Sequence, residues 1–351
     1  MTSARLIVLL AFVGAACAPS GPDLSSASRF PATATPSLPP AATAAGSPAR
    51  TPDLGAVKLV EFPVGRGQGP HDVAPAPDGG VWYTAQRTGE LGYFDPKTGA
   101  TRMVKLGSGS APHGVIVGPD GNPWITDGGL NAILRVDART NEVTRYPLPG
   151  PNVNLNTATF DKNGTLWFTG QSGYYGYLKE DRVTVLSATG GPGPYGISTC
   201  PNGNVYYASL AASQIGMINL ASTTMALADP PTKGQGARRV WCDSRSNVWV
   251  SEWNAGQVAQ LQTESGYTSW REWKLPGADP MAYAVYVDES DIVWLTDFGA
   301  NAIVRFDPRT ETFTSYPHAQ PNGAVRQLLG RPGEVWGAMS GQDKLLLIRT
   351  R

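Results

Sequence analysis

A large aromatic residue recurs about every 42 residues through most of this 351-residue chain. Successive positions are 42, 43, 39, 43, 45 and 42 residues apart, and each begins a short strand-like tetrapeptide such as WITD. The seven residues are Trp82, Trp124, Trp167, Tyr206, Trp249, Trp294 and Trp336. Most follow a turn such as Pro119-Asp120-Gly121, where glycine suits the positive φ of a tight hairpin. Four short strands per repeat predict an all-β fold, a seven-bladed β-propeller spanning 57–351.

The two ends of the repeat region complement each other. In the seventh repeat we expect a third strand at 343–349 and no outer strand after it. Upstream of the first repeat, Glu61-Phe62-Pro63-Val64 resembles the outer-strand sequence Arg145-Tyr146-Pro147-Leu148. We therefore expect 57–64 to close the ring beside the C-terminal strand, which hides two sheet edges. The repeated aromatics are expected to pack between blades.

The first 56 residues differ in composition from the repeats. A basic residue, an apolar run over 6–16 and small residues before Cys17 predict a secretory signal over 1–17. Small residues ending at a cysteine resemble a bacterial lipobox, which would make Cys17 the lipidated first residue of the mature protein. An ordinary secretory signal with an incidental Cys17 is the alternative. Residues 18–56, rich in Pro, Ala, Ser and Thr, are expected to be a disordered tether.

The predicted register gathers polar residues at one mouth of the central channel. Antiparallel pairing about each turn sets the residue eleven before the aromatic opposite the residue three after it. The first set is His71, His113, Asn156, Tyr195, Arg238, Tyr283 and, shifted by one, Val325 or Arg326; the second is Ala85, Asp127, Gly170, Ser209, Glu252, Asp297 and Met339.

These positions hold the candidate catalytic and metal-binding side chains of the sequence. His71 and His113 suit proton transfer, and Asp127, Glu252 and Asp297 suit a hard cation. Candidate ligand contacts are Arg238, Arg239, Tyr195, Tyr283 and Arg326. As alternatives, the histidines could cap their strands, and the acids could pair with the arginines. His318, after an outer strand, is expected at the surface.

Cys200 and Cys242 occupy nearly the same point of adjacent repeats, 42 residues apart. A disulfide is chemically permitted outside the cytoplasm, but two buried free thiols are the simpler expectation. The chain has 28 basic and 28 acidic residues, and this balance argues against a nucleic-acid partner. We expect a monomer outside the cytoplasm, attached to a membrane only through the lipid, with a small-molecule or peptide ligand at the mouth.

The repeat Pro-His-Gly-Val followed by Gly-Pro-Asp-Gly, Trp-Ile-Thr-Asp and Asn-Ala-Ile resembles the virginiamycin B lyase family of seven-bladed propellers. The likeness covers 57–351 and is clearest over 112–137 and 249–307. It implies a Mg²⁺-dependent elimination that opens a cyclic depsipeptide antibiotic at its ester bond, and hence antibiotic resistance. A histidine base removes the proton while a cation held by carboxylates stabilises the developing charge.

The resemblance implies His113 as the base, His71 as an auxiliary acid, and Asp127 with Glu252 or Asp297 at the cation. The family motif also has an acid two residues before its histidine, where this chain has Gly69 and Ala111. Two other functions stay open on the residues alone: a surface-tethered propeller that binds a ligand without chemistry, and a Ca²⁺-dependent lactonase-like hydrolase.

Overall fold

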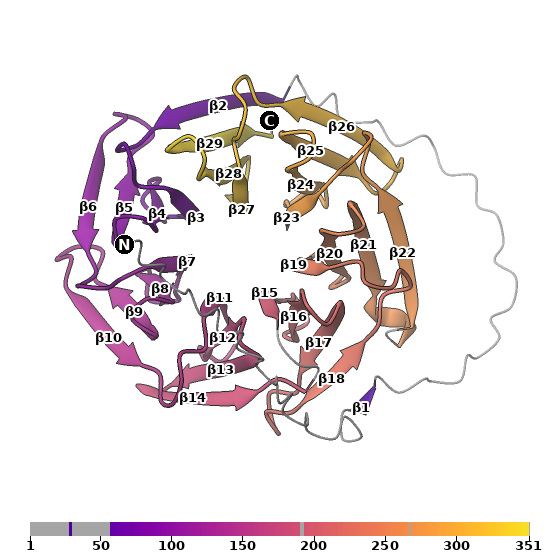
Figure 1. Cartoon of the computed structure of the whole chain (residues 1–351), viewed down its shortest axis with the longest axis horizontal. Coiled ribbons are helices and arrows are strands. Elements are labelled where there is room, and N and C mark those ends of the chain that lie inside the picture. The colour runs from indigo at the N-terminus through magenta and orange to yellow at the C-terminus, as the bar shows by residue number, and fades with distance from the viewer. Residues whose placement is uncertain (1–27, 30–56, 190–192, 267, 351) are drawn as a thin grey trace, which may run out of the picture.

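The computed structural model describes residues 28–29, 57–189, 193–266 and 268–350. Within them, four-stranded sheets stand around a central channel as the seven blades of a propeller, which confirms the predicted fold (Figure 1). Each blade is an antiparallel meander whose first strand lies at the channel and whose last strand lies outside. The described residues include no helix with the length and apolarity needed to cross a bilayer.

The blades follow the order of the sequence repeats. Blade 1 contains β3 (Pro70–Pro75), β4 (Val81–Ala85), β5 (Glu90–Phe94) and β6 (Thr101–Lys105). Blade 2 contains β7 (Pro112–Val117), β8 (Pro123–Asp127), β9 (Ala132–Val136) and β10 (Val143–Pro147). Blade 3 contains β11 (Leu155–Phe160), β12 (Leu166–Gly170), β13 (Tyr174–Lys179) and β14 (Arg182–Ser187).

Blade 4 contains β15 (Pro194–Thr199), β16 (Val205–Ser209), β17 (Gln214–Ile218) and β18 (Met225–Ala228), and β1 (Ser28–Arg29) lies parallel to β18. Blade 5 contains β19 (Ala237–Cys242), β20 (Val248–Glu252), β21 (Gln257–Gln262), the 3-10 turn η2 (Thr263–Ser265) and β22 (Ser269–Lys274). Blade 6 contains β23 (Ala282–Val287), β24 (Val293–Asp297), β25 (Ala302–Asp307) and β26 (Thr312–Pro317).

Blade 7 is built from both ends of the propeller sequence, as predicted. Its first three strands are β27 (Val325–Arg331), β28 (Glu334–Met339) and β29 (Lys344–Arg349), and the outer strand is β2 (Lys58–Pro63). β2 pairs antiparallel with β29 from Lys58 opposite Arg349 to Pro63 opposite Lys344. The ring is therefore closed by backbone hydrogen bonds between segments almost 300 residues apart in sequence.

The repeated aromatics pack between blades, as their spacing predicts. Trp336 of blade 7, for example, lies in one apolar cluster with Tyr83 and Phe94 of blade 1. Trp82, Trp249, Trp294 and Tyr206 are each at most 1% exposed and contact the following blade in the same way. Trp124 is the half-buried exception, stacked on Tyr146 with ring centroids 5.7 Å apart.

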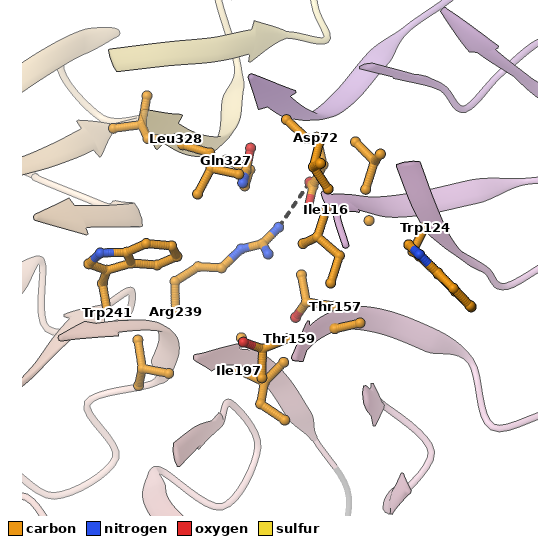
Figure 2. A pocket seen from close by; sticks show the side chains of 18 of the residues that line it. Asp72, Ile116, Trp124, Thr157, Thr159, Ile197, Arg239, Trp241, Gln327 and Leu328 are labelled. Carbon is orange, nitrogen blue, oxygen red and sulfur yellow. Dashed lines mark hydrogen bonds and ion pairs between the residues drawn. The ribbon is translucent and has the colours of Figure 1, made fainter. Parts of the chain in front are cut away.

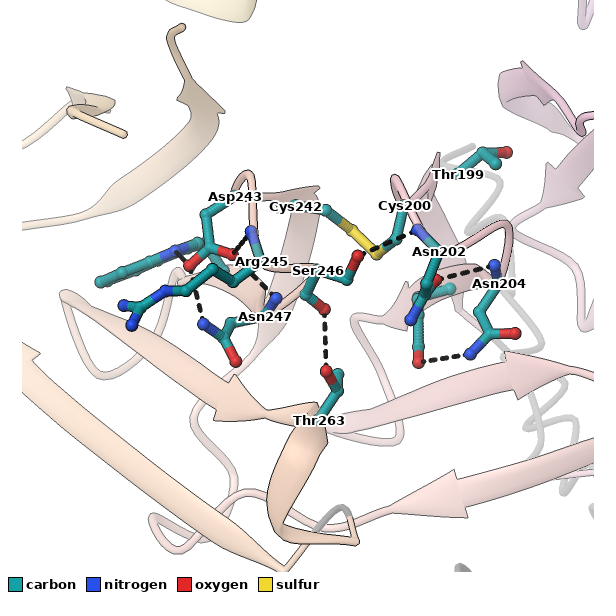
Figure 3. The surroundings of a disulfide bond; sticks show 12 residues. Thr199, Cys200, Asn202, Asn204, Cys242, Asp243, Arg245, Ser246, Asn247 and Thr263 are labelled. Atoms are coloured by element: carbon teal, nitrogen blue, oxygen red, sulfur yellow. Dashed lines mark hydrogen bonds between the residues drawn. A yellow bond between two sulfur atoms is a disulfide. The ribbon is translucent and has the colours of Figure 1, made fainter. Parts of the chain in front are cut away.

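Cys200 and Cys242 form a disulfide, so the expectation of two free thiols is wrong. The two Cα atoms are 5.3 Å apart, within the range that a disulfide spans. The bond joins the ends of the innermost strands β15 and β19, which are neighbours around the channel (Figure 3). The strand ends approach closely because the blades converge toward the axis.

The predicted signal over 1–17 with Cys17, and the tether over 18–56 apart from Ser28–Arg29, lie outside the described residues.

Candidate functional site

The residues eleven before each repeated aromatic, or ten before it in the seventh repeat, meet at one end of the channel. We call them the mouth ring: His71, His113, Asn156, Tyr195, Arg238, Tyr283 and Arg326. Contacts link members from every blade, including blades that are not neighbours, such as Tyr195 and Tyr283. Their convergence agrees with the expectation that these positions share one mouth.

The predicted pairing at the mouth is wrong by one residue. Asp127 pairs with Pro112 and Thr126 with Gly114, so His113 is an extra residue in a β-bulge. The same irregularity occurs at the start of the innermost strand in every blade. A bulge turns the extra side chain away from its pleat. The mouth-ring residue therefore faces the channel, while the residue three after the aromatic does not oppose it.

A hydroxyl two residues after the aromatic holds most of these bulges. Thr126 Oγ1 accepts a hydrogen bond from Gly114 N at 2.9 Å and donates to the carbonyl of Asn156 in the next blade at 2.5 Å. Thr84 makes the same two contacts, with Asp72 N and with the carbonyl of His113. Each hydroxyl thus fixes its own bulge and positions the mouth-ring residue of its neighbour.

The two histidines form the centre of one side of the ring. Their imidazole centroids are 3.9 Å apart. His71 Nδ1 lies 2.8 Å from Asp72 Oδ1, and the same oxygen accepts a hydrogen bond from the Arg239 guanidinium at 3.2 Å. A carboxylate acceptor requires the proton on His71 Nδ1, which leaves Nε2 as the basic nitrogen.

His113 has the opposite arrangement. Asn156 Nδ2 donates to its Nε2 at 3.2 Å, so a neutral imidazole carries its proton on Nδ1. That Nδ1 is buried and has no hydrogen-bond partner among the described residues. In this arrangement His71 offers a lone pair and His113 offers a proton.

The other side of the ring is aromatic and cationic. The hydroxyls of Tyr195 and Tyr283 share a hydrogen bond of 2.6 Å. Arg238 donates to Tyr195 Oη at 3.0 Å, and its guanidinium carbon lies 3.7 Å from the centre of the Tyr283 ring. Arg326 Nη1 reaches Tyr283 Oη at 3.4 Å. Sequence reasoning named all four residues as ligand contacts, and the structure brings them together.

Burial and positive charge decide protonation at this site. Burial, reinforced by the nearby arginines, holds the pKa of His71 well below its usual value, and burial with the adjacent His71 does the same for the pKa of His113. Although burial opposes ionisation of its hydroxyl, the arginines and the Tyr195 hydrogen bond lower the pKa of Tyr283. Both imidazoles are therefore neutral near pH 7, beside three guanidinium groups and one carboxylate.

The three acids predicted at the cation lie in three different blades, and each is engaged locally. Asp127 Oδ1 accepts from the backbone of Ala111 and Leu130. Asp297 Oδ1 accepts from the backbone of Met281, Gly299 and Ala300. These two carboxylates cap the loops that lead into the mouth.

Glu252 is held differently from these two acids. Its Oε2 accepts a hydrogen bond of 2.6 Å from Gln257, and its Oε1 has no partner among the described residues. Burial raises the pKa of Glu252 to about 8.

His318, expected at the surface, has an imidazole only 2% exposed, 3.8 Å from Glu61.

The donor set does not fit Mg²⁺. Among the described residues, the single cluster of three metal-ligating side chains is His71, Asp72 and His113, whose ligand atoms lie within 4.8 Å of one another. Mg²⁺ prefers oxygen ligands and retained waters, whereas this cluster offers two imidazoles and one carboxylate. That carboxylate already pairs with Arg239, and the neighbouring guanidiniums repel a cation.

Sequence reasoning missed Asp72 and the bulge-holding hydroxyls. Thr or Ser recurs two residues after the aromatic in five of the seven repeats, a signal that was available in the sequence. Asp72 has no such signal, because only the bulge turns a residue that follows His71 toward the channel.

Below the mouth ring, the channel widens into a cavity of about 370 Å³. Its lining includes residues from the innermost strands of all seven blades. Asp72 and Arg239, which contact each other (Figure 2), lie at the mouth-ring end, where Asp72 also contacts His71. Apolar residues, among them Ile116, Ile197 and Leu328, make up most of the remaining wall.

Comparison with known proteins gives one family and several similar structures. A model described as the virginiamycin B lyase family matches residues 43–271. A streptogramin B lyase structure is 22% identical, with a TM-score of 0.77 over 84% of this chain and 97% of its own. A catalytically inactive variant of virginiamycin B lyase from Staphylococcus aureus, solved with quinupristin, is 20% identical, with a TM-score of 0.78 over 84% and 99%.

A third similar structure is the extracellular domain of a one-component system from B. thetaiotaomicron. It is 16% identical, with a TM-score of 0.65 over 84% of this chain and 42% of its own. Comparison with curated proteins finds no match. At these identities, the solved structures support the fold alone.

Proposed function

The chain belongs to the virginiamycin B lyase family, and from this premise we propose that it opens a cyclic depsipeptide or related ester by C–O elimination. In this proposal, arginines take the role of the Mg²⁺ that the family resemblance implies. The observation that carries the proposal is the pair of neutral imidazoles at the mouth, one of them oriented by Asp72 and both beside Arg238, Arg239 and Arg326.

In the proposed reaction, His71 Nε2 takes the proton α to a carbonyl of the substrate. The electron pair of that C–H bond forms a C=C bond to the neighbouring carbon. The bond between that neighbouring carbon and the ester oxygen breaks, and the ester group leaves as a carboxylate. Asp72 orients His71 and stabilises the imidazolium that forms. The imidazolium then gives up its proton and the leaving carboxylate takes one up, directly or through solvent, so the linear acid has the same composition as the cyclic substrate.

The remaining mouth-ring residues stabilise negative charge in this scheme. Guanidinium groups preorganised beside the reacting carbonyl can stabilise an enolate without reorganising during the reaction. Arg238 and Arg326 are half-buried and face the tyrosine pair, so they are the donors assigned to this task. His113, with its unpartnered Nδ1, is assigned as a neutral donor, which reverses the roles that the resemblance implied.

The test is the mass of the product formed from quinupristin. Elimination gives a linear product of unchanged mass. A product heavier by one water, with solvent oxygen incorporated, would instead favour the lactonase-like hydrolase and overturn the proposal. Intact quinupristin at high enzyme concentration would also overturn it.

A second candidate is a propeller that binds its ligand without chemistry. It is favoured by the closure of the mouth, since His71 and His113 are only 4% and 8% exposed. This candidate predicts saturable, 1:1 binding of a depsipeptide that is recovered intact. Detection of any linear product above the uncatalysed rate excludes it.

The proposal includes export and anchoring of the protein outside the cytoplasm. The disulfide between Cys200 and Cys242 supports an oxidising compartment, because such bonds rarely persist in the cytosol. Cys17 is the proposed lipidation site. Labelling of cells with radioactive palmitate is expected to mark the wild-type protein and to leave a Cys17→Ser variant unlabelled; equal labelling would contradict the assignment.

A further inference from the structure

The channel cavity lies beyond the mouth ring, and its apolar walls take no part in the proposed reaction. Its walls follow the innermost strands from Asp72 to Pro75, from Gly114 to Val117 and from Gln327 to Gly330. Residues near the strand starts are buried, whereas Ile116, Phe160 and Leu329, near the strand ends, are half-buried. The cavity therefore opens at the end of the channel opposite the histidines.

The cavity is polar at its closed end and apolar toward its opening. Arg239 extends across the channel to Asp72, with Gln327 and Thr157 beside it (Figure 2). Ile116, Ile197, Leu328 and Trp241 line the rest. A volume of about 370 Å³ lies in the range of small-molecule sites. This arrangement matches a molecule with a polar head and an apolar body.

The charged side chains at the closed end of the cavity indicate the charge that the polar head of the ligand carries. Arg239 is 5% exposed, and its Nε has no hydrogen-bond partner among the described residues. Within the described part of the chain, Asp72 is the one carboxylate in contact with Arg239, while Arg238 and Arg326 stand nearby in the mouth ring. A buried guanidinium with an unused N–H, in a region of net positive charge, is a site for an anion.

We propose that the channel cavity binds an amphiphile with a single carboxylate, whose head is held by Arg239 and whose alkyl body lies against Ile116, Ile197, Leu328 and Trp241. A carboxylate can accept from Nε and a terminal nitrogen of the guanidinium at once, which neither an alcohol nor an amine can do. The apolar wall contributes free energy in proportion to the apolar area that it buries. Asp72 and Arg239 are shared with the mouth, but ligand binding in the cavity is measured without turnover, so the inference does not depend on the proposed elimination.

The test is calorimetric titration of the full chain with octanoate, 1-octanol, octylammonium and acetate. Octanoate is expected to bind 1:1 at least tenfold more tightly than the other three, because they lack the anionic head or the alkyl body. Equal affinity for octanoate and octanol, or no binding of octanoate, would overturn the proposal.

Two variants locate the site. Ile116→Trp fills the cavity without changing a charge and is expected to weaken octanoate binding at least tenfold. Thr144→Trp, at an exposed position on β10 of the same blade, serves as its control and is expected to bind like the wild type. Unchanged binding in Ile116→Trp would place octanoate elsewhere and contradict the proposal.

Arg239→Gln tests the head contact. It is expected to remove the preference for octanoate over octanol while octanol still binds. Because this variant leaves Asp72 without its guanidinium, its folding is checked by the melting temperature, and Ile116→Trp decides the proposal if Arg239→Gln does not fold. A folded Arg239→Gln that keeps the full preference would contradict the role of Arg239.

Discussion

At the scale of single residues, the account depends on how two similar histidines differ. His71 donates through Nδ1 to Asp72, whereas His113 accepts through Nε2 from Asn156. Both are buried and both lie eleven residues before the repeated aromatic, so the sequence alone does not distinguish their roles. Their hydrogen-bond partners distinguish the proposed base, His71, from the proposed donor, His113.

We therefore expect His71→Ala to lower kcat on quinupristin by about 10²–10⁴-fold, the usual contribution of a general base. The KM is expected to change little, because the imidazole is not assigned a binding contact. A smaller loss is expected for His113→Ala. Steady-state kinetics check this, and full activity in His71→Ala with loss in His113→Ala would restore the opposite assignment.

The depressed pKa of His71 also predicts the pH dependence of the reaction. The base must be neutral, and burial holds the pKa of His71 well below 6.5. Activity is therefore expected to persist as the pH falls through 6.5 and to be lost only at lower pH. A rate profile of kcat/KM with an acidic midpoint at or above 6.5 would contradict this.

Glu252 predicts a pH dependence of stability. Its pKa is raised from 4.5 to about 8, so between these values the folded protein keeps a proton that the unfolded chain has lost. The free energy of unfolding should fall as the pH rises through this window, by up to about 1.4 kcal/mol per pH unit. Urea unfolding at several pH values should show this slope in the wild type and in an exposed control, Glu142→Gln, and a much smaller slope in Glu252→Gln.

At the scale of elements, the bulge at the start of each innermost strand decides what reaches the channel. Hairpin spacing alone predicts unbroken pairing and sets His113 opposite Asp127. The bulge inserts one residue, directs the mouth ring inward and leaves Asp127 to cap a loop. The regular spacing of the repeats identified the mouth-ring positions because the bulge occurs in every blade. It could not show that the residues three after each aromatic, such as Asp127, do not lie opposite the mouth ring.

Thr126→Val tests the hydroxyl that holds this bulge. The change keeps the shape of the side chain but leaves Gly114 N–H and the Asn156 carbonyl without their partner. Two unsatisfied buried groups are expected to cost about 1–3 kcal/mol of stability and to weaken quinupristin turnover. Urea unfolding checks the first effect, with the exposed Thr144→Val as control; equal stability of the two variants would show that the hydroxyl is dispensable.

At the scale of the whole molecule, the sequence predicts a closed ring. The seven-fold spacing and the complementary ends predict the blade number and the β2–β29 closure, because both depend on patterns that every blade repeats. The disulfide could not be predicted, since the separation of two strand ends depends on how the blades converge at the axis.

Reduction of the Cys200–Cys242 bond is expected to destabilise the propeller without unfolding it. A crosslink that closes a loop of 42 residues typically contributes about 2–4 kcal/mol. Removal by a double Cys→Ser change should lower the melting temperature, and a reductant should lower that of the wild type alone. Equal melting temperatures with and without reductant would mean that no disulfide is present in solution.

The central claim of the proposal is that guanidinium groups at the mouth take the role of the Mg²⁺ that the family resemblance implies. The most direct measurement is the rate of quinupristin opening in excess chelator, followed by mass spectrometry. Unchanged formation of a linear product of the same mass, with loss of that product in Arg238→Gln, is the predicted result. Activity that disappears with chelator and returns on addition of Mg²⁺ would contradict the claim.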